Sequence, residues 1–223
     1  MILVPVKNSN NAKQRLSEVL DGASRTELAQ AMLRDVLETL ASWRDQSLPE
    51  HCSGIALVTS DTYAVGLADE LRLEVIRDET NPGETGAIEM ATRLCEERGL
   101  ESTLVIPGDI PLLAGWELDE IYAKAPKEGS VLVPAADGRG TNAAWRRPAG
   151  LFPLRFGNDS FKPHLAAARA SGKPCVILSL PGIALDVDRP EDLQELALAA
   201  GNGHAQQLAR QWDLSGYPMA ANE

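Results

Sequence analysis

The sequence predicts an α/β fold built on a mixed, mostly parallel sheet with helices on both faces. Short apolar runs that suit strands buried on both faces occur at 2–6, 54–59, 73–76, 104–106, 130–134 and 174–178. Segments with helical spacing or with helix start signals lie between most of these runs. Because strands and helices alternate, right-handed parallel crossovers are favoured. We find neither an internal repeat nor a linker, so we expect one domain over 1–200 and a C-terminal tail over 201–223.

The composition restricts the class of partner. The chain has 223 residues, of which 44% are hydrophobic and 24% charged, as in an ordinary globular domain. Its net charge of −11 argues against a broad nucleic-acid or anionic membrane surface. No apolar run is long enough to span a bilayer and no basic segment precedes the first strand, so we expect a cytoplasmic location. Three scattered cysteines indicate neither a disulfide framework nor a zinc site.

One aspartate follows the central apolar run directly. Pro107 and Pro111 prevent a regular continuation on either side of Gly108-Asp109, so Asp109 is expected at the carboxyl end of a strand. That edge of an open α/β sheet is where ligands bind, and an aspartate there commonly holds a divalent metal on nucleotide phosphates. A plain turn is the alternative, because Gly-Asp between prolines is good turn chemistry.

A basic loop follows the first apolar run. Lys7, Lys13 and Arg15 could hold a triphosphate, because the loop after the first strand faces the same crevice. A solvated surface loop is the alternative. The loop lacks glycine, and neither G-x-G-x-x-G nor G-x-x-x-x-G-K-[ST] is present in the chain. Dinucleotide and P-loop sites therefore lose their main support.

Several helices are expected at definite places. The capping box formed by Ser24 and Glu27 predicts a helix that runs to about Trp43. Further helices are expected over 62–70, 87–98, 116–124 and 164–170, with a helical turn near 208–212. At the start of the helix expected over 87–98, Thr85 and Gly86 would offer free backbone N–H groups to a phosphate or a purine edge, unless they only cap the helix.

Two polar segments in the second half could bind an anionic ligand. Thr141 and Asn142, after a glycine-flanked arginine, supply a hydroxyl and an amide for a phosphate or carboxylate, although the segment also suits a plain hairpin loop. Gly157 and Ser160 precede a helical run in a similar way. Within that run, His164 is interpreted as a packing or capping residue rather than a catalyst.

A second acidic segment comes near the end of the expected domain. Extended geometry over 186–188 would place Asp186 and Asp188 on one face and Val187 on the other. Pro190 then starts a helix as a favoured first-turn residue. Asp188 could instead cap that helix.

The combination of these segments resembles the CofC/FbiD family, the guanylyltransferases that act in coenzyme F-420 biosynthesis. The resemblance runs from about residue 2 to residue 196. It is carried by Pro5-Val6-Lys7, Lys13-x-Arg15-Leu16, Ile106-Pro107-Gly108-Asp109-Ile110-Pro111-Leu112, Gly140-Thr141-Asn142, Arg155-Phe156-Gly157-x-x-Ser160-Phe161 and Leu185-Asp186-Val187-Asp188-x-Pro190-Glu191-Asp192-Leu193.

The resemblance implies a nucleotidyltransferase with a glycosyltransferase-A-like sheet. Such an enzyme would transfer GMP from GTP to the phosphate of phosphoenolpyruvate, 2-phospho-L-lactate or 3-phospho-D-glycerate and release pyrophosphate. GTP and a small phosphorylated carboxylic acid are thus the expected partners, and a homodimer is a possible assembly.

The resemblance also implies a role for each candidate residue. Mg²⁺ would be held by Asp109 and Asp188. Asp109 would act in catalysis with the triphosphate-binding residues Lys7, Lys13 and Arg15, and the base would lie near Thr85 and Gly86. The phosphoacid would lie on Thr141, Asn142, Gly157 and Ser160. The family often has asparagine at the position of Thr85, so this chain departs from the pattern near the base.

Three alternatives stay open. A sugar-phosphate or molybdenum-cofactor nucleotidyltransferase usually has a glycine-rich loop where this chain has Lys7-Asn8-Ser9-Asn10-Asn11. A glycosyltransferase commonly has a D-x-D metal site, which Asp186-Val187-Asp188 matches superficially, but this segment stands just before the last expected domain helix. A non-catalytic nucleotide-binding subunit could have kept the fold without the activity.

Overall fold

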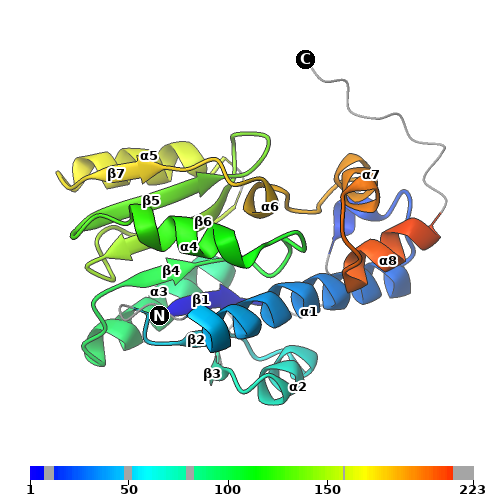
Figure 1. Cartoon of the computed structure of the whole chain (residues 1–223), viewed down its shortest axis with the longest axis horizontal. Helices are drawn as coiled ribbons and strands as arrows, with labels where there is room; N and C mark the ends of the chain where they lie inside the picture. Colours follow the sequence, from blue (N-terminus) through cyan, green and yellow to red (C-terminus); the bar gives the residue numbers. More distant parts are fainter. Residues whose placement is uncertain (8–12, 48–51, 79–82, 158, 213–223) are drawn as a thin grey trace.

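A central sheet orders the molecule (Figure 1). The computed structural model describes residues 1–7, 13–47, 52–78, 83–157 and 159–212. Within these residues seven strands pair in the order β3-β2-β1-β4-β6-β5-β7. Their bounds are Ile2–Pro5 (β1), Ile55–Val58 (β2), Glu74–Ile76 (β3), Thr103–Val105 (β4), Gly129–Pro134 (β5), Thr141–Arg147 (β6) and Cys175–Ile177 (β7). Only β6 pairs antiparallel with its neighbours, so the predicted mixed, mostly parallel sheet is confirmed.

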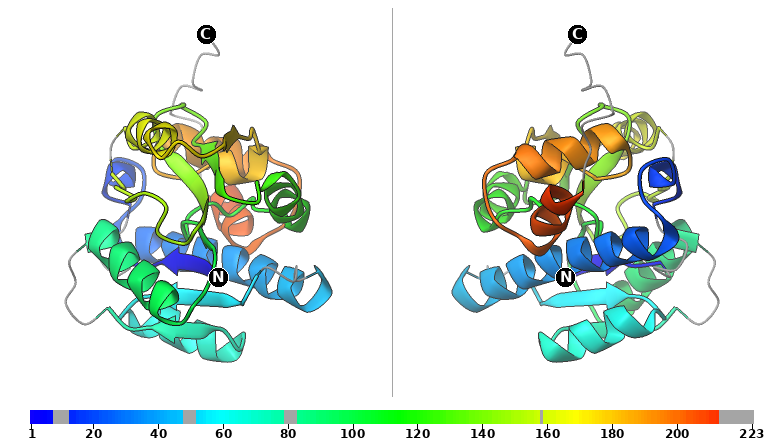
Figure 2. Two further views of the ribbon diagram at one scale, coloured as in Figure 1. Left: turned by 90° about the vertical axis from the view of Figure 1, so that its left-hand side faces the viewer. Right: turned by 90° about the vertical axis from the view of Figure 1, so that its right-hand side faces the viewer.

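Helices cover both faces of the sheet, as predicted. They are α1 (Gly22–Ser47), α2 (Thr62–Glu70), α3 (Gly83–Glu97), α4 (Gly115–Lys124), α5 (Phe161–Ala170), α6 (Pro181–Ala184), α7 (Pro190–Leu198) and α8 (His204–Gln211), with a short 3-10 helix η2 at Gln14–Leu16. Side chains alternate along each strand, so Ile2 and Val4 pack under α1 while Leu3 packs under α3. Helices α3 and α5 lie on one side of the sheet and α4 and α6 on the other (Figure 2).

Strand β6 was not among the strands that the sequence analysis expected. Its residues, Thr-Asn-Ala-Ala-Trp-Arg-Arg, contain no aliphatic run, so the usual signal of a buried strand is absent. The strand forms because β4 and β5 both pair with it. Since β6 runs against its neighbours, it begins at the sheet edge where β4 and β5 end. Thr141 and Asn142 therefore lie at the carboxyl edge of the sheet.

Helix α1 begins earlier than the sequence predicts. The backbone N–H of Ser24 donates to Oδ1 of Asp21 at 2.8 Å, and the helix starts at Gly22. The predicted capping box at Ser24 and Glu27 is therefore wrong. Asp21 is the better acceptor because its carboxylate is charged and favours the positive end of the helix dipole.

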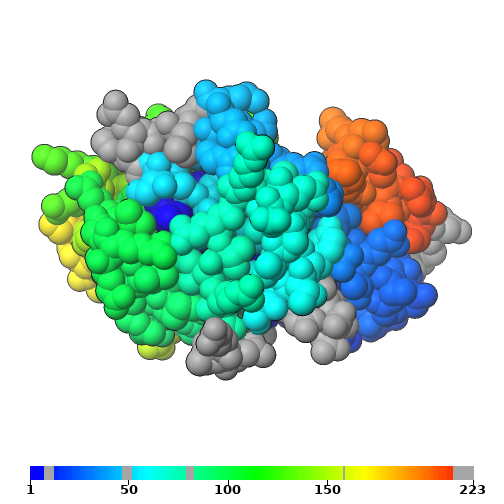
Figure 3. Space-filling view, turned by 90° about the horizontal axis from the view of Figure 1, so that it is seen from below, coloured from blue at the N-terminus to red at the C-terminus, as the bar shows by residue number. Residues whose placement is uncertain are grey.

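The last described helix packs closely into the molecule. Ala205 and Ala209 of α8 are buried in a separate apolar cluster with residues of α1 and α7. Asp35 of α1 accepts hydrogen bonds from the backbone N–H groups of His204 and Ala205, at 2.8 and 2.9 Å. The helical turn expected near 208–212 thus begins earlier, at residue 204, and residues 213–223 of the expected tail lie outside the described part. The surfaces of α7 and α8 adjoin the N-terminal part of α1 in Figure 3.

Candidate active site

A polar cavity of about 320 Å³ lies at the carboxyl edge of the sheet. The turn after β4, the start of β6, the loop before α5 and the segment between α6 and α7 contribute to it. Its walls include Arg15, Glu84, Asp109, Arg139, Thr141, Asn142, Gly157, Asp159, Ser160, Asp186, Asp188 and Arg189. Segments from both halves of the sequence therefore meet at the edge that the fold class predicts for a ligand.

The turn that presents Asp109 is pressed against α1. A Cβ added at Gly108 would lie 2.9 Å from Cδ1 of Leu33, so only glycine fits there without a shift. The backbone N–H of Val187 donates to the carbonyl of Asp109 at 3.2 Å. This bond ties the acidic segment over 186–188 to the turn after β4. These contacts hold the turn at the cavity, where Asp109 lines the wall.

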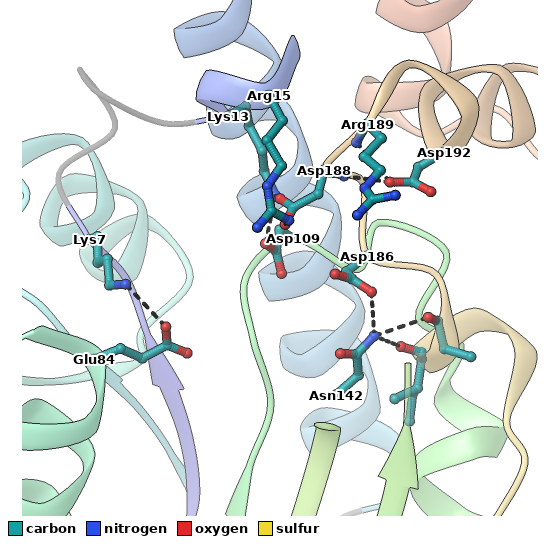
Figure 4. Close-up of polar contacts among 12 residues, drawn as sticks. Lys7, Lys13, Arg15, Glu84, Asp109, Asn142, Asp186, Asp188, Arg189 and Asp192 are labelled. Carbon is teal, nitrogen blue, oxygen red and sulfur yellow. Dashed lines mark hydrogen bonds and ion pairs between the residues drawn. The ribbon is translucent and has the colours of Figure 1, made fainter. Parts of the chain in front are cut away.

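Lys13 joins two carboxylates that are far apart in the sequence. Its Nζ lies 2.6 Å from Oδ2 of Asp109 and 2.6 Å from Oδ1 of Asp188 (Figure 4). The Lys13 side chain is only 7% exposed, against 33% and 38% for the two aspartates. Burial opposes the charge of Lys13, but the two carboxylates outweigh it and raise the pKa of Lys13. The cluster is therefore held together by one internal cation.

Arg15 completes this cluster from the exposed side. Its Nη1 lies 3.5 Å from Oδ2 of Asp188. Burial acts to raise the pKa of Asp188, yet Lys13 and then Arg15 outweigh this effect and hold the pKa below its ordinary value. Asp188 is thus ionised at neutral pH, as a metal ligand must be.

Asp188 does not cap α7, which was the alternative interpretation. Asp192 accepts hydrogen bonds from the backbone N–H groups of Asp188 and Arg189, at 3.0 and 2.8 Å. The carboxylate of Asp188 is left to face Lys13. Val187 is fully buried on the opposite side while Asp186 and Asp188 line the cavity, so the predicted sharing of one face is confirmed.

Asp186 is a third carboxylate on the cavity wall. Its pKa is raised to about 6, chiefly by burial and in part by Asp109 and Asp188, while the hydrogen bond from Asn142 opposes the rise. Nδ2 of Asn142 lies 3.0 Å from Oδ1 of Asp186 and from the carbonyls of Ile183 and Ala184. The amide nitrogen of Asn142 is thus engaged within the protein. It holds the acidic segment in place from the start of β6.

The donor set is compatible with a hard divalent cation. Asp109 and Asp188 offer carboxylate oxygens, which Mg²⁺ prefers, and one ammonium group pairs with both, offsetting one of their two negative charges. Over the described ranges, no group of three or more His, Cys, Asp or Glu side chains is arranged to hold a metal by itself. Water or substrate oxygens would therefore have to complete the coordination, as is usual for Mg²⁺.

A group of uncharged side chains, called the neutral wall below, lies on another part of the cavity wall. Oγ of Ser160 accepts a hydrogen bond from the backbone N–H of Thr141 at 3.0 Å, and Nδ1 of His164 lies 2.9 Å from Oγ1 of Thr141. All three side chains are almost completely buried. Gly157, with φ of 129°, takes a backbone conformation that other residues rarely adopt. The structure therefore brings the predicted phosphoacid residues Thr141, Gly157 and Ser160 together.

Lys7, Thr85 and Gly86 lie to one side of this cavity. Lys7 is exposed, and its Nζ forms an ion pair with Glu84 at 3.3 Å, apart from the Lys13 cluster (Figure 4). Helix α3 begins at Gly83 rather than at the predicted residue 87, so Thr85 and Gly86 lie in its first turn. Oγ1 of Thr85 accepts a hydrogen bond from the backbone N–H of Phe156 at 3.0 Å. Thr85 thus supports the loop that carries Gly157.

Several residues of the cavity wall were not among the predicted site residues, among them Glu84, Arg139, Asp159 and Arg189. Burial raises the pKa of Glu84, and Lys7 opposes this effect. Arg139 and Asp159 form an exposed ion pair, and Arg189 stands beside Asp188. The sequence placed Arg139 between two glycines, which could have identified it. No sequence pattern identified Glu84, Asp159 or Arg189, because a charged residue in a helix start or a loop is usually only solvated.

No helix in the described part of the chain is both long and apolar enough to cross a membrane.

Solved structures show the same fold at low identity. A protein described as a nucleotide-diphospho-sugar transferase, from Desulfovibrio desulfuricans, matches with a TM-score of 0.74 at 20% identity, covering 94% of this chain and 93% of that one. A nucleotidyl transferase from Methanothermobacter matches with a TM-score of 0.57 at 15% identity, covering 94% and 97%. These matches support the nucleotidyltransferase architecture.

Curated relatives match at higher identity over most of the chain. A phosphoenolpyruvate guanylyltransferase from Roseiflexus castenholzii is 32% identical over 210 residues, covering 94% of this chain and 93% of its own. A 2-phospho-L-lactate guanylyltransferase from Methanothermobacter thermautotrophicus is 31% identical, covering 93% and 88%. A 3-phospho-D-glycerate guanylyltransferase from Colwellia psychrerythraea is 32% identical, covering 88% and 90%. Residues 1–221 match the family described as "Guanylyl transferase CofC like", and the chain therefore belongs to that family of nucleotidyltransferases.

Proposed function

We propose that this enzyme transfers GMP from GTP to the phosphate of a small phosphoacid and releases pyrophosphate. The acceptor is phosphoenolpyruvate, 2-phospho-L-lactate or 3-phospho-D-glycerate, the substrates in the names of the relatives. The observation that carries the proposal is one cavity with an ionised Lys13–Asp109–Asp188 cluster on one wall and the hydroxyls of Thr141 and Ser160 on the other. The charged cluster suits a nucleoside triphosphate with its Mg²⁺, and the two hydroxyls suit an acceptor phosphate.

The chemistry needs alignment more than proton transfer. An oxygen of the acceptor phosphate attacks the α-phosphorus of GTP, a new P–O bond forms, and the bond to the leaving pyrophosphate breaks. A phosphomonoester has its second pKa at about 6, so the attacking oxygen is mostly ionised at neutral pH and needs no general base. The protein has to hold the two phosphates in line and neutralise charge on their oxygens.

The residues of the cluster divide this task. Mg²⁺ would be held by Asp109 and Asp188, and when bound it would supply positive charge to the phosphate oxygens of GTP. Lys13 would be released for the triphosphate once these carboxylates hold the metal. Lys7 and Arg15 would bind the same group from the exposed side, and the base would lie near Thr85 and Gly86. Thr141, Gly157 and Ser160 would bind the acceptor, while Asn142 would act by holding Asp186.

The cellular setting follows from the same proposal. A reaction between GTP and a phosphoacid belongs in the cytoplasm, where both substrates are made, and we assign it to coenzyme F-420 biosynthesis. A homodimer is the proposed assembly. Light scattering on the purified protein would separate a dimer from a monomer.

Pyrophosphate release tests the proposal directly. GTP and Mg²⁺ are incubated with each of the three phosphoacids separately, the series is repeated with ATP, and the products are identified by mass. We expect release with GTP and one preferred acid, and a product that joins the acid to GMP. Release only with a sugar phosphate or with molybdopterin would point to the related nucleotidyltransferases. GTP binding without release under any condition would favour the non-catalytic alternative.

A further inference from the structure

His164 of α5 lies behind the neutral wall of the cavity, where it is 1% exposed. Its imidazole contacts two groups from different segments. The backbone N–H of Arg155 donates to Nε2 at 2.8 Å. On the opposite side of the ring, Nδ1 lies 2.9 Å from Oγ1 of Thr141. The ring therefore bridges the loop that carries Gly157 and the first residue of β6.

The bond from Arg155 decides which ring nitrogen carries the proton. A backbone N–H can only donate, so Nε2 must accept and cannot itself be protonated. The proton of the neutral ring is then on Nδ1, and Nδ1 donates to Oγ1 of Thr141. A doubly protonated ring is disfavoured, because burial, and then the buried guanidinium of Arg146, lower the pKa of His164 to about 4.

This arrangement fixes the direction of two hydroxyl groups. Oγ1 of Thr141 accepts from His164, and Oγ of Ser160 accepts from the backbone N–H of Thr141. Since each oxygen has an acceptor position filled from inside the protein, its own hydrogen is free to point away from that donor. Both residues line the cavity. Two hydroxyl donors facing one cavity suit an anion, because phosphate oxygens can only accept.

We propose that His164 is a positioning residue that makes the Thr141 hydroxyl a hydrogen-bond donor to the phosphate of the acceptor substrate. The proposal rests on the proposed function, because that function places the phosphoacid on Thr141. It assigns His164 no contact with substrate and no proton transfer. A histidine that only fills space beneath α5 would not require a particular tautomer.

The tautomer can be measured without any substrate. The chain has three histidines, so the nitrogen-15 NMR spectrum of histidine-labelled protein is simple, and the His164→Gln variant identifies the signals of His164. We expect a protonated Nδ1 and an unprotonated Nε2 that do not change between neutral and mildly acidic pH. A protonated Nε2 would overturn the proposal even if the protein proved to be an active guanylyltransferase. The expected spectrum from a protein inactive with every acid would count against the proposed function instead.

Two substitutions separate the two bonds of the ring. In His164→Asn the side-chain amide nitrogen can take the place of Nδ1 and donate to Thr141, but the bond from Arg155 is lost. In His164→Gln the side-chain oxygen can take the place of Nε2 and accept from Arg155, but the donor to Thr141 is lost. We expect the glutamine variant to raise KM for the phosphoacid about tenfold, the loss of one oriented hydrogen bond, while KM for GTP stays constant. The KM of the His164→Asn variant for the phosphoacid should stay closer to that of the parent protein.

A double variant tests whether the effect passes through Thr141. Thr141→Val removes the hydroxyl at nearly constant volume. In that background, His164→Gln should cause no further rise in KM for the phosphoacid, because the hydroxyl that His164 orients is gone. His164 would only hold the loop at Arg155 if His164→Gln raised the KM for the phosphoacid by the same factor with and without Thr141→Val. A His164→Gln variant more active than His164→Asn would show the same. Circular dichroism confirms that each variant is folded before its kinetics are compared.

Discussion

The two walls of the cavity are built on opposite principles. The charged wall, Lys13, Asp109 and Asp188, holds three formal charges in contact, and its carboxylates are about one-third exposed. On the neutral wall, Thr141 and Ser160, with His164 behind them, carry no formal charge, and all three side chains are almost fully buried. Charges near water can exchange one cation for another at modest cost, whereas buried hydrogen bonds have no competing partner. The charged wall is therefore suited to exchange its cation, and the neutral wall to keep one geometry.

The largest effect is expected on the charged wall. Asp109→Asn or Asp188→Asn removes one of two carboxylates around Lys13 while keeping the shape of the side chain. Turnover should fall about a hundredfold or more, because charge stabilisation at the transferred phosphate is usually the largest catalytic contribution. The assay is pyrophosphate release at saturating Mg²⁺. Asp69→Asn, an exposed substitution on α2, is the matched control, and unchanged turnover in Asp109→Asn would remove that carboxylate from the mechanism.

Lys13→Met tests whether the internal cation and Mg²⁺ compete for the same carboxylates. Without Lys13 the two aspartates repel each other, so we expect the free energy of unfolding to fall by about 2 kcal/mol, less than for a fully buried pair because the aspartates are partly exposed. Mg²⁺ should restore more stability to the variant than to the parent protein. Urea unfolding with and without MgCl₂ measures this difference.

The control for that experiment is Lys124→Met, which breaks an exposed pair with Glu120 on α4. It should change stability little and should not respond to Mg²⁺. If Mg²⁺ stabilised the parent and the Lys13→Met variant equally, Lys13 and the metal would not share these ligands.

The neutral wall can be perturbed by pH. The pKa of His164 is lowered to about 4 in the folded protein from 6.5, so the unfolded state binds more protons between these values. The contribution of neutral His164 to the free energy of unfolding is complete above pH 6.5, its pKa in the unfolded state. It is lost as the pH falls toward about 4, its pKa in the folded protein. Between neutral pH and about pH 5, the free energy of unfolding should fall by about 2 kcal/mol more in the parent protein than in the His164→Gln variant. Urea unfolding at both pH values measures the difference, and His204→Gln, at an exposed histidine, should behave like the parent.

The smallest effect is expected at the exposed edge of the cavity. Arg139 and Asp159 form an ion pair with side chains 59% and 58% exposed. Arg139→Gln should change the free energy of unfolding by less than about 0.5 kcal/mol, because water screens such pairs. A double-mutant cycle with Asp159→Asn measures the pair alone. A coupling as large as the effect of Lys13→Met would contradict the distinction between exposed and internal charges.

The sequence alone determined the fold class and the acidic strand ends. Apolar runs alternate with helical segments, and Asp109 follows such a run between two prolines, so both signals are local. The shared face of Asp186 and Asp188 follows from the alternation of an extended chain, which also needs no tertiary information. The joint order of these local motifs was enough to identify the family, although no single motif was specific.

Only the tertiary structure decided how these segments act on one another. Strand β6 has no aliphatic run and forms because two neighbouring strands pair with it, which places Thr141 at the cavity. Helix α8 depends on Asp35, which lies 169 residues before His204 in the chain. Lys13 was expected to bind phosphates, but its nearest carboxylates come from two distant segments. His164 looked like a packing residue because its partners, Arg155 and Thr141, meet only in the fold. Local signals cannot encode such contacts, since each depends on the spatial position of residues far away in sequence.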